Sequence, residues 1–386
     1  MRQILHIDIN SFFASCEQVV DKNMRGKPIA VVSSIEGRNA ILLAVSYEAK
    51  ACGIKRTMSI REAKNLCPGL NLKVANHQLY QEFSKKFVDI LCEYAPIVEN
   101  TSIDEAYLDM SGTERLYGDI KDFAKKLQGI ILNQLLLPTS IGISDNKLLA
   151  KMASDYKKPM GITELYGKNI KKLMWALSVD NLIGVGEKTL EILKRLGIYT
   201  IGELAVFDET QLKMYFGDKT THMLHNFANG IDNSQVLHYD IDSAKSVGSE
   251  ITFEKDVILE DIIKKQLLII AEKVASRLRK INKRARTVTL KIKYNNFTVV
   301  TRSHTLDKTF NTTDTIYKTA VNLYKEHCIK TIPIRLIGIQ LSGICEACAE
   351  QLSLFSIQSD IKNEKVEKTI DEIRRKYGYN SIRRGR

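Results

Sequence analysis

The chain has 386 residues, of which 44% are hydrophobic and 26% charged, and its formal net charge is +12. This length exceeds one ordinary core, and the balance of apolar and charged residues is typical of a globular rather than a disordered chain. No apolar run is long enough for a membrane span, and Asp8 falls where a signal peptide needs its apolar core. We therefore expect a cytoplasmic protein of several domains with no membrane segment.

Cysteine and charge are distributed unevenly. The seven cysteines are scattered and odd in number, and Cys345 and Cys348 form a lone CxxC, so reduced thiols fit better than a disulfide framework or a zinc site. Residues 243–341 contain 19 Lys and Arg against 9 Asp and Glu, and residues 356–386 contain 9 against 5. A concentrated basic block indicates a polyanion partner such as nucleic acid. The alternative, a solvated lysine-rich face, does not require charge confined to one half of the chain.

The predicted elements begin with a strand at residues 5–10 that alternates apolar and polar side chains, so we expect a half-buried strand with Asp8 on its polar face. A helix at 11–20, strands at 30–32 and 40–45 joined by a polar turn at 33–39, a helix at 80–93 and a strand hairpin at 97–109 follow. A helix at 121–136, a strand at 139–143 and a helix at 146–155 complete a predicted α+β unit.

A second, helical unit is predicted at residues 166–232. Gly184 and Gly186 form a Gly-x-Gly turn between two apolar segments that we expect to be helices, which is typical of a helix-hairpin-helix. The glycines allow backbone N–H groups at a helix N-terminus to approach a phosphate closely, which positions a duplex without reading its sequence. A tight helix–helix turn without a ligand is the alternative.

A polar stretch at 233–243 reads as a linker, and a third unit follows. It has a strand at 246–253, a helix at 259–280, strands at 287–294 and 299–306, a helix at 313–327 and a strand at 334–341. This βαββαβ unit holds the basic block. In the tail, Val366, Ile370, Ile373 and Tyr377 are spaced for one face of a helix, which could pack on the protein or on a partner.

Three carboxylates suggest the chemistry. Asp104 and Glu105 are adjacent in the strand-like segment 102–109, and Asp8 lies in the first predicted strand. Magnesium takes oxygen ligands of this kind together with phosphates. A pair of such cations stabilises the attacking and leaving oxygens of an in-line phosphoryl displacement. The sequence therefore predicts nucleotidyl transfer.

Six motifs in this order resemble those of the Y-family (DinB/UmuC-type) translesion DNA polymerases. They are residues 7–13, 46–50, 102–109, 142–147 and 158–161 and the hairpin at Gly184. The resemblance implies a multidomain α+β right hand: a ferredoxin-like palm at 1–20 and 75–165, small fingers at 21–74, a helical thumb at 166–232, a linker at 233–243, a little finger at 244–342 and a tail at 343–386. It also implies template-directed, low-fidelity addition of dNMPs to a primer 3′-hydroxyl, in translesion synthesis and DNA repair.

The same resemblance implies roles for individual residues. Two magnesium ions, which manganese can replace, would be bound by Asp8, Asp104, Glu105 and the backbone carbonyl of Ile9. The incoming nucleotide would be bound by Phe12, Phe13, Tyr47, Lys50 and Lys158, with Phe13 as the steric gate that excludes a 2′-hydroxyl. Lys50 departs from the family, which commonly has Arg here. Since lysine cannot form a bidentate fork to phosphate, we expect the nucleotide to be held more weakly.

Implied partners are primer–template DNA, dNTPs and the sliding (β) clamp, and we expect a monomer. The DNA-binding residues would be Gly184, Gly186, Lys188, Lys245, Ser246, Arg284, Arg286, Lys291, Lys293 and Arg302. The segment Gln351-Leu352-Ser353-Leu354-Phe355 resembles a clamp-docking peptide, in which Leu and Phe anchors enter a pocket and Gln fixes the register. Two alternatives stay open: a UmuC-like subunit active only with partner proteins, and a catalytically silent clamp- and DNA-binding accessory protein.

Overall fold

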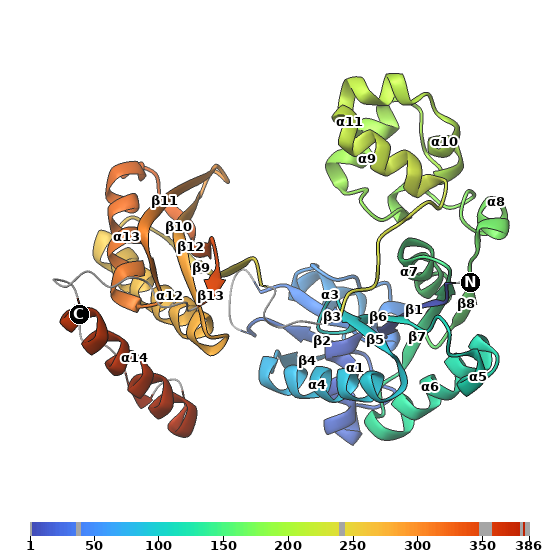
Figure 1. The fold of residues 1–386 in the computed structure, drawn as a ribbon, viewed down its shortest axis with the longest axis horizontal. Coiled ribbons are helices and arrows are strands. Elements are labelled where there is room, and N and C mark those ends of the chain that lie inside the picture. Colours follow the sequence, from blue (N-terminus) through green and yellow to red (C-terminus); the bar gives the residue numbers. More distant parts are fainter. Residues whose placement is uncertain (1, 36–39, 239–243, 347–356, 379–380, 383–386) are drawn as a thin grey trace. The chain divides into compact units, whose positions relative to one another are not determined.

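The computed structural model describes the chain except residues 1, 36–39, 239–243, 347–356, 379–380 and 383–386 (Figure 1). The chain separates into two compact units, Met1–Tyr239 and Asp240–Arg386. The predicted palm, fingers and thumb lie in the first unit and the predicted little finger in the second. Among the described helices, none is long and apolar enough to cross a membrane.

A five-stranded sheet forms the centre of the first unit, with strand order β5-β6-β1-β7-β8. The middle strand, β1, pairs antiparallel with both β6 and β7. Asp104 lies just before β6 rather than within a strand, whereas Glu105 begins β6. The strands are β1 (Ile4–Ile9), β5 (Ile97–Asn100), β6 (Glu105–Asp109), β7 (Thr139–Ser144) and β8 (Ile162–Glu164).

Helices cover both faces of this sheet. One face carries α1 (Phe12–Val20), α4 (His77–Tyr94) and α6 (Ile120–Leu135), which share an apolar core with β1; the short α5 (Glu114–Tyr117) precedes α6. On the other face α7 (Lys147–Tyr156) packs so closely that a Cβ at Gly142 of β7 would lie 1.9 Å from the Ala150 carbonyl oxygen. Every residue of β1 is therefore buried, including His6 and Asp8. The prediction that β1 is half-buried was wrong, because α7 covers the polar face of this strand.

The predicted fingers form a separate small layer with its own core. Their sheet has the order β3-β2-β4, in which β2 pairs antiparallel with β3 and parallel with β4. The two predicted strands are confirmed, and part of the predicted turn between them falls outside the described residues. The elements are β2 (Ile29–Val32), β3 (Leu42–Val45), α2 (Tyr47–Ala51), α3 (Ile60–Leu66) and β4 (Asn71–Val74).

The predicted thumb is helical, and its core includes side chains of α7. Its helices are α8 (Ile170–Leu173), α9 (Glu187–Arg195), α10 (Ile201–Val206) and α11 (Glu209–Ala228). Before the Gly-x-Gly turn the helical residues are the short 3-10 turn Val179–Asn181, and α9 begins directly after Gly186. The Val179 N–H donates to the Tyr199 carbonyl (2.9 Å) and Ser178 bridges to Thr200, which joins this turn to the residues before α10.

The first part of the predicted linker is fixed to the palm. Val236 is 5% exposed and packs with Ile4 and Tyr107 of the central sheet. The Leu237 N–H donates to a carboxylate oxygen of Glu99 (2.8 Å). Val236 and the Leu237 N–H therefore tie the start of the predicted linker to the first unit, whereas residues 233–235, 237 and 238 are exposed.

The second unit is the predicted βαββαβ sheet, with strand order β11-β10-β12-β9. Helices α12 and α13 share one core with this sheet, which fixes which strand positions face inward. The two-residue β13 pairs with the start of β10. The elements are β9 (Ser246–Val257), α12 (Glu260–Lys280), β10 (Lys283–Tyr294), β11 (Val299–Phe310), α13 (Thr313–His327), β12 (Ile334–Ser342) and β13 (Cys345–Glu346).

The tail forms helix α14 (Ile357–Tyr377), which α12 binds through ion pairs. Arg279 of α12 contacts Asp371 (2.6 Å), and Arg374 of α14 contacts Glu272 (2.9 Å). Val366, a member of the predicted apolar face, is 48% exposed. The helix therefore packs on its own chain, and it does so through paired charges that hydrophobic periodicity does not reveal.

Candidate active site

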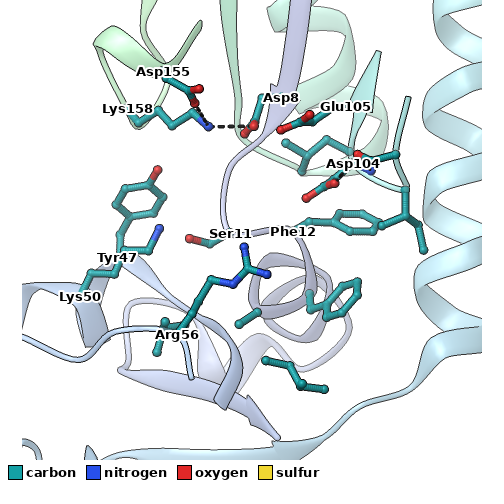
Figure 2. A pocket seen from close by; sticks show the side chains of 17 residues that line it. Asp8, Ser11, Phe12, Tyr47, Lys50, Arg56, Asp104, Glu105, Asp155 and Lys158 are labelled. Atoms are coloured by element: carbon teal, nitrogen blue, oxygen red, sulfur yellow. Dashed lines mark hydrogen bonds and ion pairs between the residues drawn. The ribbon is translucent and has the colours of Figure 1, made fainter. Parts of the chain in front are cut away.

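A cavity of about 510 Å³ opens where the predicted palm meets the predicted fingers (Figure 2). Its walls come from the end of β1 and the start of α1, and from the loop before β6. Residues of β3, of α2 and of the turn after α2 also line it. The end of α7 and the segment that follows it complete the lining. It is lined by Asp8, Ile9, Ser11, Phe12, Phe13, Leu43, Ala44, Val45, Tyr47, Lys50, Arg56, Ser102, Ile103, Asp104, Glu105, Asp155 and Lys158.

Strand register brings two of the predicted carboxylates together. Asp8 and Glu105 are direct partners in the antiparallel β1–β6 ladder, so their side chains lie on the same face. The Ile9 N–H donates to the Asp104 carbonyl (3.0 Å), which fixes the third carboxylate residue beside the end of β1. Hydrogen bonding of the central sheet thus assembles residues that are about a hundred positions apart in the sequence.

The Asp8 carboxylate is buried and paired with one cation. Lys158 Nζ lies 2.7 Å from Asp8 and 2.7 Å from Asp155, so it bridges the two. Burial raises the pKa of Asp8 to about 7, because Lys158 only partly compensates for lost hydration and the adjacent Glu105 adds repulsion. The free site therefore holds two close carboxylates that disfavour ionising together.

Glu105 and Asp104 have partners of their own. His6 (3.7 Å) and Lys151 (2.8 Å) flank the Glu105 carboxylate and hold its pKa below the usual range. The Ser102 hydroxyl donates to Asp104 (2.7 Å). Within the described residues, no three His, Cys, Asp or Glu side chains are close enough together to hold a metal ion.

The donor chemistry nevertheless fits a hard divalent cation. Asp8 and Glu105 supply carboxylate oxygens at one point, Asp104 and the Ile9 backbone adjoin them, and a cation would remove the mutual repulsion of the carboxylates. Each carboxylate is occupied by a lysine or a hydroxyl in the free protein. Cation binding would require exchange of these partners, chiefly Lys158 from Asp8 and Ser102 from Asp104.

The two adjacent phenylalanines differ in exposure. Phe12 is 3% exposed and belongs to the palm core, although it borders the cavity. Phe13 stacks on Tyr80, with ring centroids 4.2 Å apart and planes 13° apart, and the Tyr80 hydroxyl donates to Glu17 (2.7 Å). Phe13 is thus the ring that packing on α4 holds rigidly at the cavity wall.

Cationic side chains line the side of the cavity opposite Asp8, Asp104 and Glu105. Ser46 caps the N-terminus of α2 by accepting from the Ala49 N–H, which places Tyr47 and Lys50 on the first turns of that helix. Lys50 Nζ lies 4.2 Å from the Tyr47 ring centroid, a cation–π contact. Figure 2 shows both side chains at the cavity, across from Asp8, Asp104 and Glu105.

Sequence reasoning missed two charged residues that line the cavity. Asp155 anchors Lys158 from three residues away on the same segment, a spacing that could have been recognised once Lys158 was singled out. Arg56 lies in a turn after α2, where no periodicity indicates the direction of a side chain.

The predicted DNA contacts of the thumb are adjacent to one another. Gly184 has φ +93°, which requires glycine, and Gly186 is the N-cap of α9, whose first turn contains Lys188. Gly186 has no side chain to satisfy the first N–H groups of α9. These groups are therefore available to an oxygen ligand, as predicted for a phosphate.

The predicted little-finger contacts do not share one face. Leu290 and Ile292 of β10 are buried under the helices, so Lys291 and Lys293 lie on the open face, and register adds Ser246 to it. Arg302 pairs with Leu290, so its side chain lies on the sheet face that carries the helices, where it stays exposed.

The remaining basic residues are placed differently. Arg284 and Arg286 donate to the Thr309 and Asp307 carbonyls of β11 (both 2.9 Å), so these two are anchored to the sheet. Lys245 is exposed just before β9. Among the open-face lysines, Lys291 pairs with Glu250 (2.7 Å).

Comparison with known proteins identifies relatives of every part of the chain. Residues 7–155 match the model of the impB/mucB/samB family, residues 244–354 its C-terminal domain, and residues 180–232 the model described as "DNA polymerase-iota, thumb domain". The chain is 40% identical to a DNA polymerase IV of Alkaliphilus oremlandii over 99% of this chain and 98% of the relative.

Two further relatives agree. A DNA polymerase IV of Clostridium kluyveri is 39% identical over 100% of this chain and 98% of its own length, and the DNA polymerase IV 1 of Bacillus subtilis is 40% identical over 100% and 92%. Among solved structures, a Y-family DNA polymerase chimera matches with a TM-score of 0.80 at 23% identity, covering 89% of this chain and 99% of that one. This last likeness shows the fold.

The register of the second unit predicts which basic residues bind nucleic acid. Lys293→Ala, on the open face, should weaken duplex binding equally for all sequences and reduce the log–log salt slope by about 1, because one phosphate contact is lost. Arg302→Ala, on the other side of the same sheet, is the matched control and should change neither. Equal losses in the two variants, measured by fluorescence anisotropy at several salt concentrations, would contradict the assignment.

Proposed function

The chain belongs to the impB/mucB/samB family and is a Y-family, DinB-type translesion DNA polymerase, and on this basis we propose that Asp8, Asp104 and Glu105, with the Ile9 carbonyl, hold two magnesium ions for nucleotidyl transfer. Manganese would substitute. The observation that carries the assignment is the convergence of these carboxylates and a group of cations on one cavity. Nothing in the comparisons favours a partner-dependent or catalytically silent protein.

Each residue of the cavity then has a physical task. Two bound cations would stabilise the charge that develops on the reacting phosphate. Strand register holds the backbones of Asp8 and Glu105 side by side, so that cation binding would require exchange of side-chain partners but no movement of the sheet. Lys158 neutralises Asp8 in the free protein and becomes available to a phosphate when Asp8 takes another partner.

We propose that Phe13 selects the sugar. Its ring is fixed on Tyr80, so it cannot retreat from a 2′-hydroxyl at low cost. Tyr47 and Lys50 would contact the triphosphate from the first turns of α2, and Phe12 would contribute through its backbone because its ring is buried.

The assignment of regions follows the separate cores. We propose a palm at residues 1–20 and 75–165, fingers at 21–74, a thumb at 166–232 and a little finger at 244–342. Four hydrophobic clusters broadly follow this division and support it, although the thumb cluster also contains side chains of α7 and the palm cluster contains Val31. The linker at 233–243 would begin with the segment that Val236 fixes to the palm. Gly184, Gly186, Lys188, Lys245, Ser246, Arg284, Arg286, Lys291 and Lys293 would hold the duplex through its backbone.

We also propose that the enzyme acts as a monomer. Its dNTPs and DNA would be met in the cytoplasm. Light scattering at the mass of a dimer under assay conditions would contradict the monomer.

The central test is primer extension by an Asp104→Asn variant. Loss of one carboxylate ligand should lower the extension rate by about two to three orders of magnitude while DNA affinity stays unchanged. Asp109→Asn is the matched control, because Asp109 ends β6, the strand that follows Asp104, and does not line the cavity. If the Asp104→Asn variant extended primers at the wild-type rate, the metal assignment would be overturned.

The sugar assignment predicts a change in substrate preference. Phe13→Ala should reduce the dNTP-to-rNTP ratio of kcat/KM by about 10- to 200-fold, since the clash that rejects the extra hydroxyl is removed. Tyr80→Phe keeps the stacked ring and loses only the hydrogen bond to Glu17, so its ratio should match the wild type. An unchanged ratio in Phe13→Ala would remove Phe13 as the gate.

We also propose that Gln351, Leu352, Leu354 and Phe355 dock on the sliding clamp. This segment lies outside the described residues, and the support is its sequence and its place between β13 and α14. Replacing Leu354 and Phe355 by Ala should abolish stimulation of primer extension by the clamp and leave unstimulated extension unchanged, because two buried anchors are lost. Full stimulation of this variant would contradict the proposal.

A further inference from the structure

The turn that joins β10 to β11 ends in a phenylalanine with an unfavourable backbone conformation. The Phe297 N–H donates to the Tyr294 carbonyl (3.0 Å), and the Tyr294 N–H donates to the Thr298 carbonyl (3.0 Å), so residues 295–297 form a three-residue hairpin loop. Phe297 has φ +67°. The last position of such a loop takes a left-handed conformation, which glycine adopts at the lowest cost. A phenylalanine at this position is therefore strained.

Packing does not compensate for this strain. Phe297 belongs neither to the core of the second unit nor to the side chains packed against that core. It is 60% exposed, and it is the one exposed phenylalanine in the part of the chain that the structure describes. Strained backbone that folding does not require is concentrated at ligand-binding positions. An exposed aromatic ring on a strained turn thus indicates a binding contact.

Two cationic side chains lie against the ring. Lys293 Nζ is 4.6 Å from the Phe297 ring centroid, and the guanidinium carbon of Arg335 is 5.1 Å from it, both within the range of a cation–π contact. Lys293 belongs to the open face of the sheet, so the ring lies at the end of that face where β10 meets the turn. Arg335 also approaches Asp256 (4.0 Å). A ligand at this turn would meet a π-face and positive charge together.

This combination matches a single strand of nucleic acid. A base stacks on an aromatic side chain whatever its sequence, while the adjoining phosphates pair with cations. Bases inside a duplex are already stacked on one another, so an unpaired strand is the form that offers free faces. We infer that Phe297 stacks on a base of single-stranded DNA, beside phosphates bound by Lys293 and Arg335. This inference rests on the proposed role of the second unit in DNA binding and adds a contact with unpaired bases to it.

The test compares two DNA substrates that differ only in the bases of their overhang. Both carry the same duplex and the same single-stranded template overhang, but one overhang consists of abasic sites, which keep the phosphates. Fluorescence anisotropy gives the affinity of the full chain for each. The wild type should prefer the overhang with bases. In Phe297→Gly this preference should fall by about 5- to 150-fold, because one stacked base is lost.

The glycine variant separates binding from folding. Glycine suits the left-handed turn, so Phe297→Gly should keep its fold, which thermal unfolding checks. Phe297→Tyr retains an aromatic face and should keep the wild-type preference. Val299→Ala is the matched control, because it removes a nearby exposed aliphatic side chain that cannot stack on a base, and it should also keep the preference.

Three results would overturn the inference. They are an unchanged preference in Phe297→Gly, an equal fall in Val299→Ala, and loss of clamp stimulation by Phe297→Gly with both DNA affinities unchanged, which would make the ring a contact for a protein. Wild-type affinity of Lys293→Ala for a blunt duplex, in contrast, would refute the duplex-binding role of the open face and not the stacking by Phe297.

Discussion

The register of β1 against β6 is the constraint on which the whole site depends. It pairs Asp8 with Glu105 and joins Ile9 to Asp104, so three acidic residues reach one end of a buried sheet. A slip of one residue would turn Asp8 to the opposite face. Close packing of α7 on β7, which leaves no room for a side chain at Gly142, brings Lys151 and Lys158 to the carboxylates.

Charge compensation links this sheet to the fingers. In the free protein, lysines on and after α7 neutralise Asp8 and Glu105, whereas Lys50 of α2 and Arg56 after it have no ion pair with any residue that the structure describes. A bound metal–nucleotide complex would compensate both groups at once. Its metal ions would bring positive charge to the carboxylates, and its phosphates would bring negative charge to the cations. The free cavity is therefore electrostatically frustrated in a way that its substrate relieves, which is how preorganised polar sites favour binding.

Motifs predicted the chemistry and most elements, because short-range patterns carry that information. The structure brings Asp8, Asp104, Glu105, Lys50 and Lys158, all singled out from motifs, to one cavity. Three features depend on distant or strained structure and escaped prediction. The cover that α7 gives to β1 comes from 140 residues away, the direction of Arg56 depends on the unusual φ of Thr57, and the face occupied by Arg302 follows from register that its sequence neighbours do not set.

One measurement tests the proposed site most directly: anomalous X-ray scattering from manganese in a crystal of the complex with primer–template DNA and the next dNTP. Two manganese peaks at Asp8, Asp104, Glu105 and the Ile9 carbonyl, with the triphosphate among Lys50, Arg56 and Lys158, are the predicted result. Manganese bound elsewhere, or a triphosphate that avoids the cations of the fingers, would contradict the assignment of this cavity.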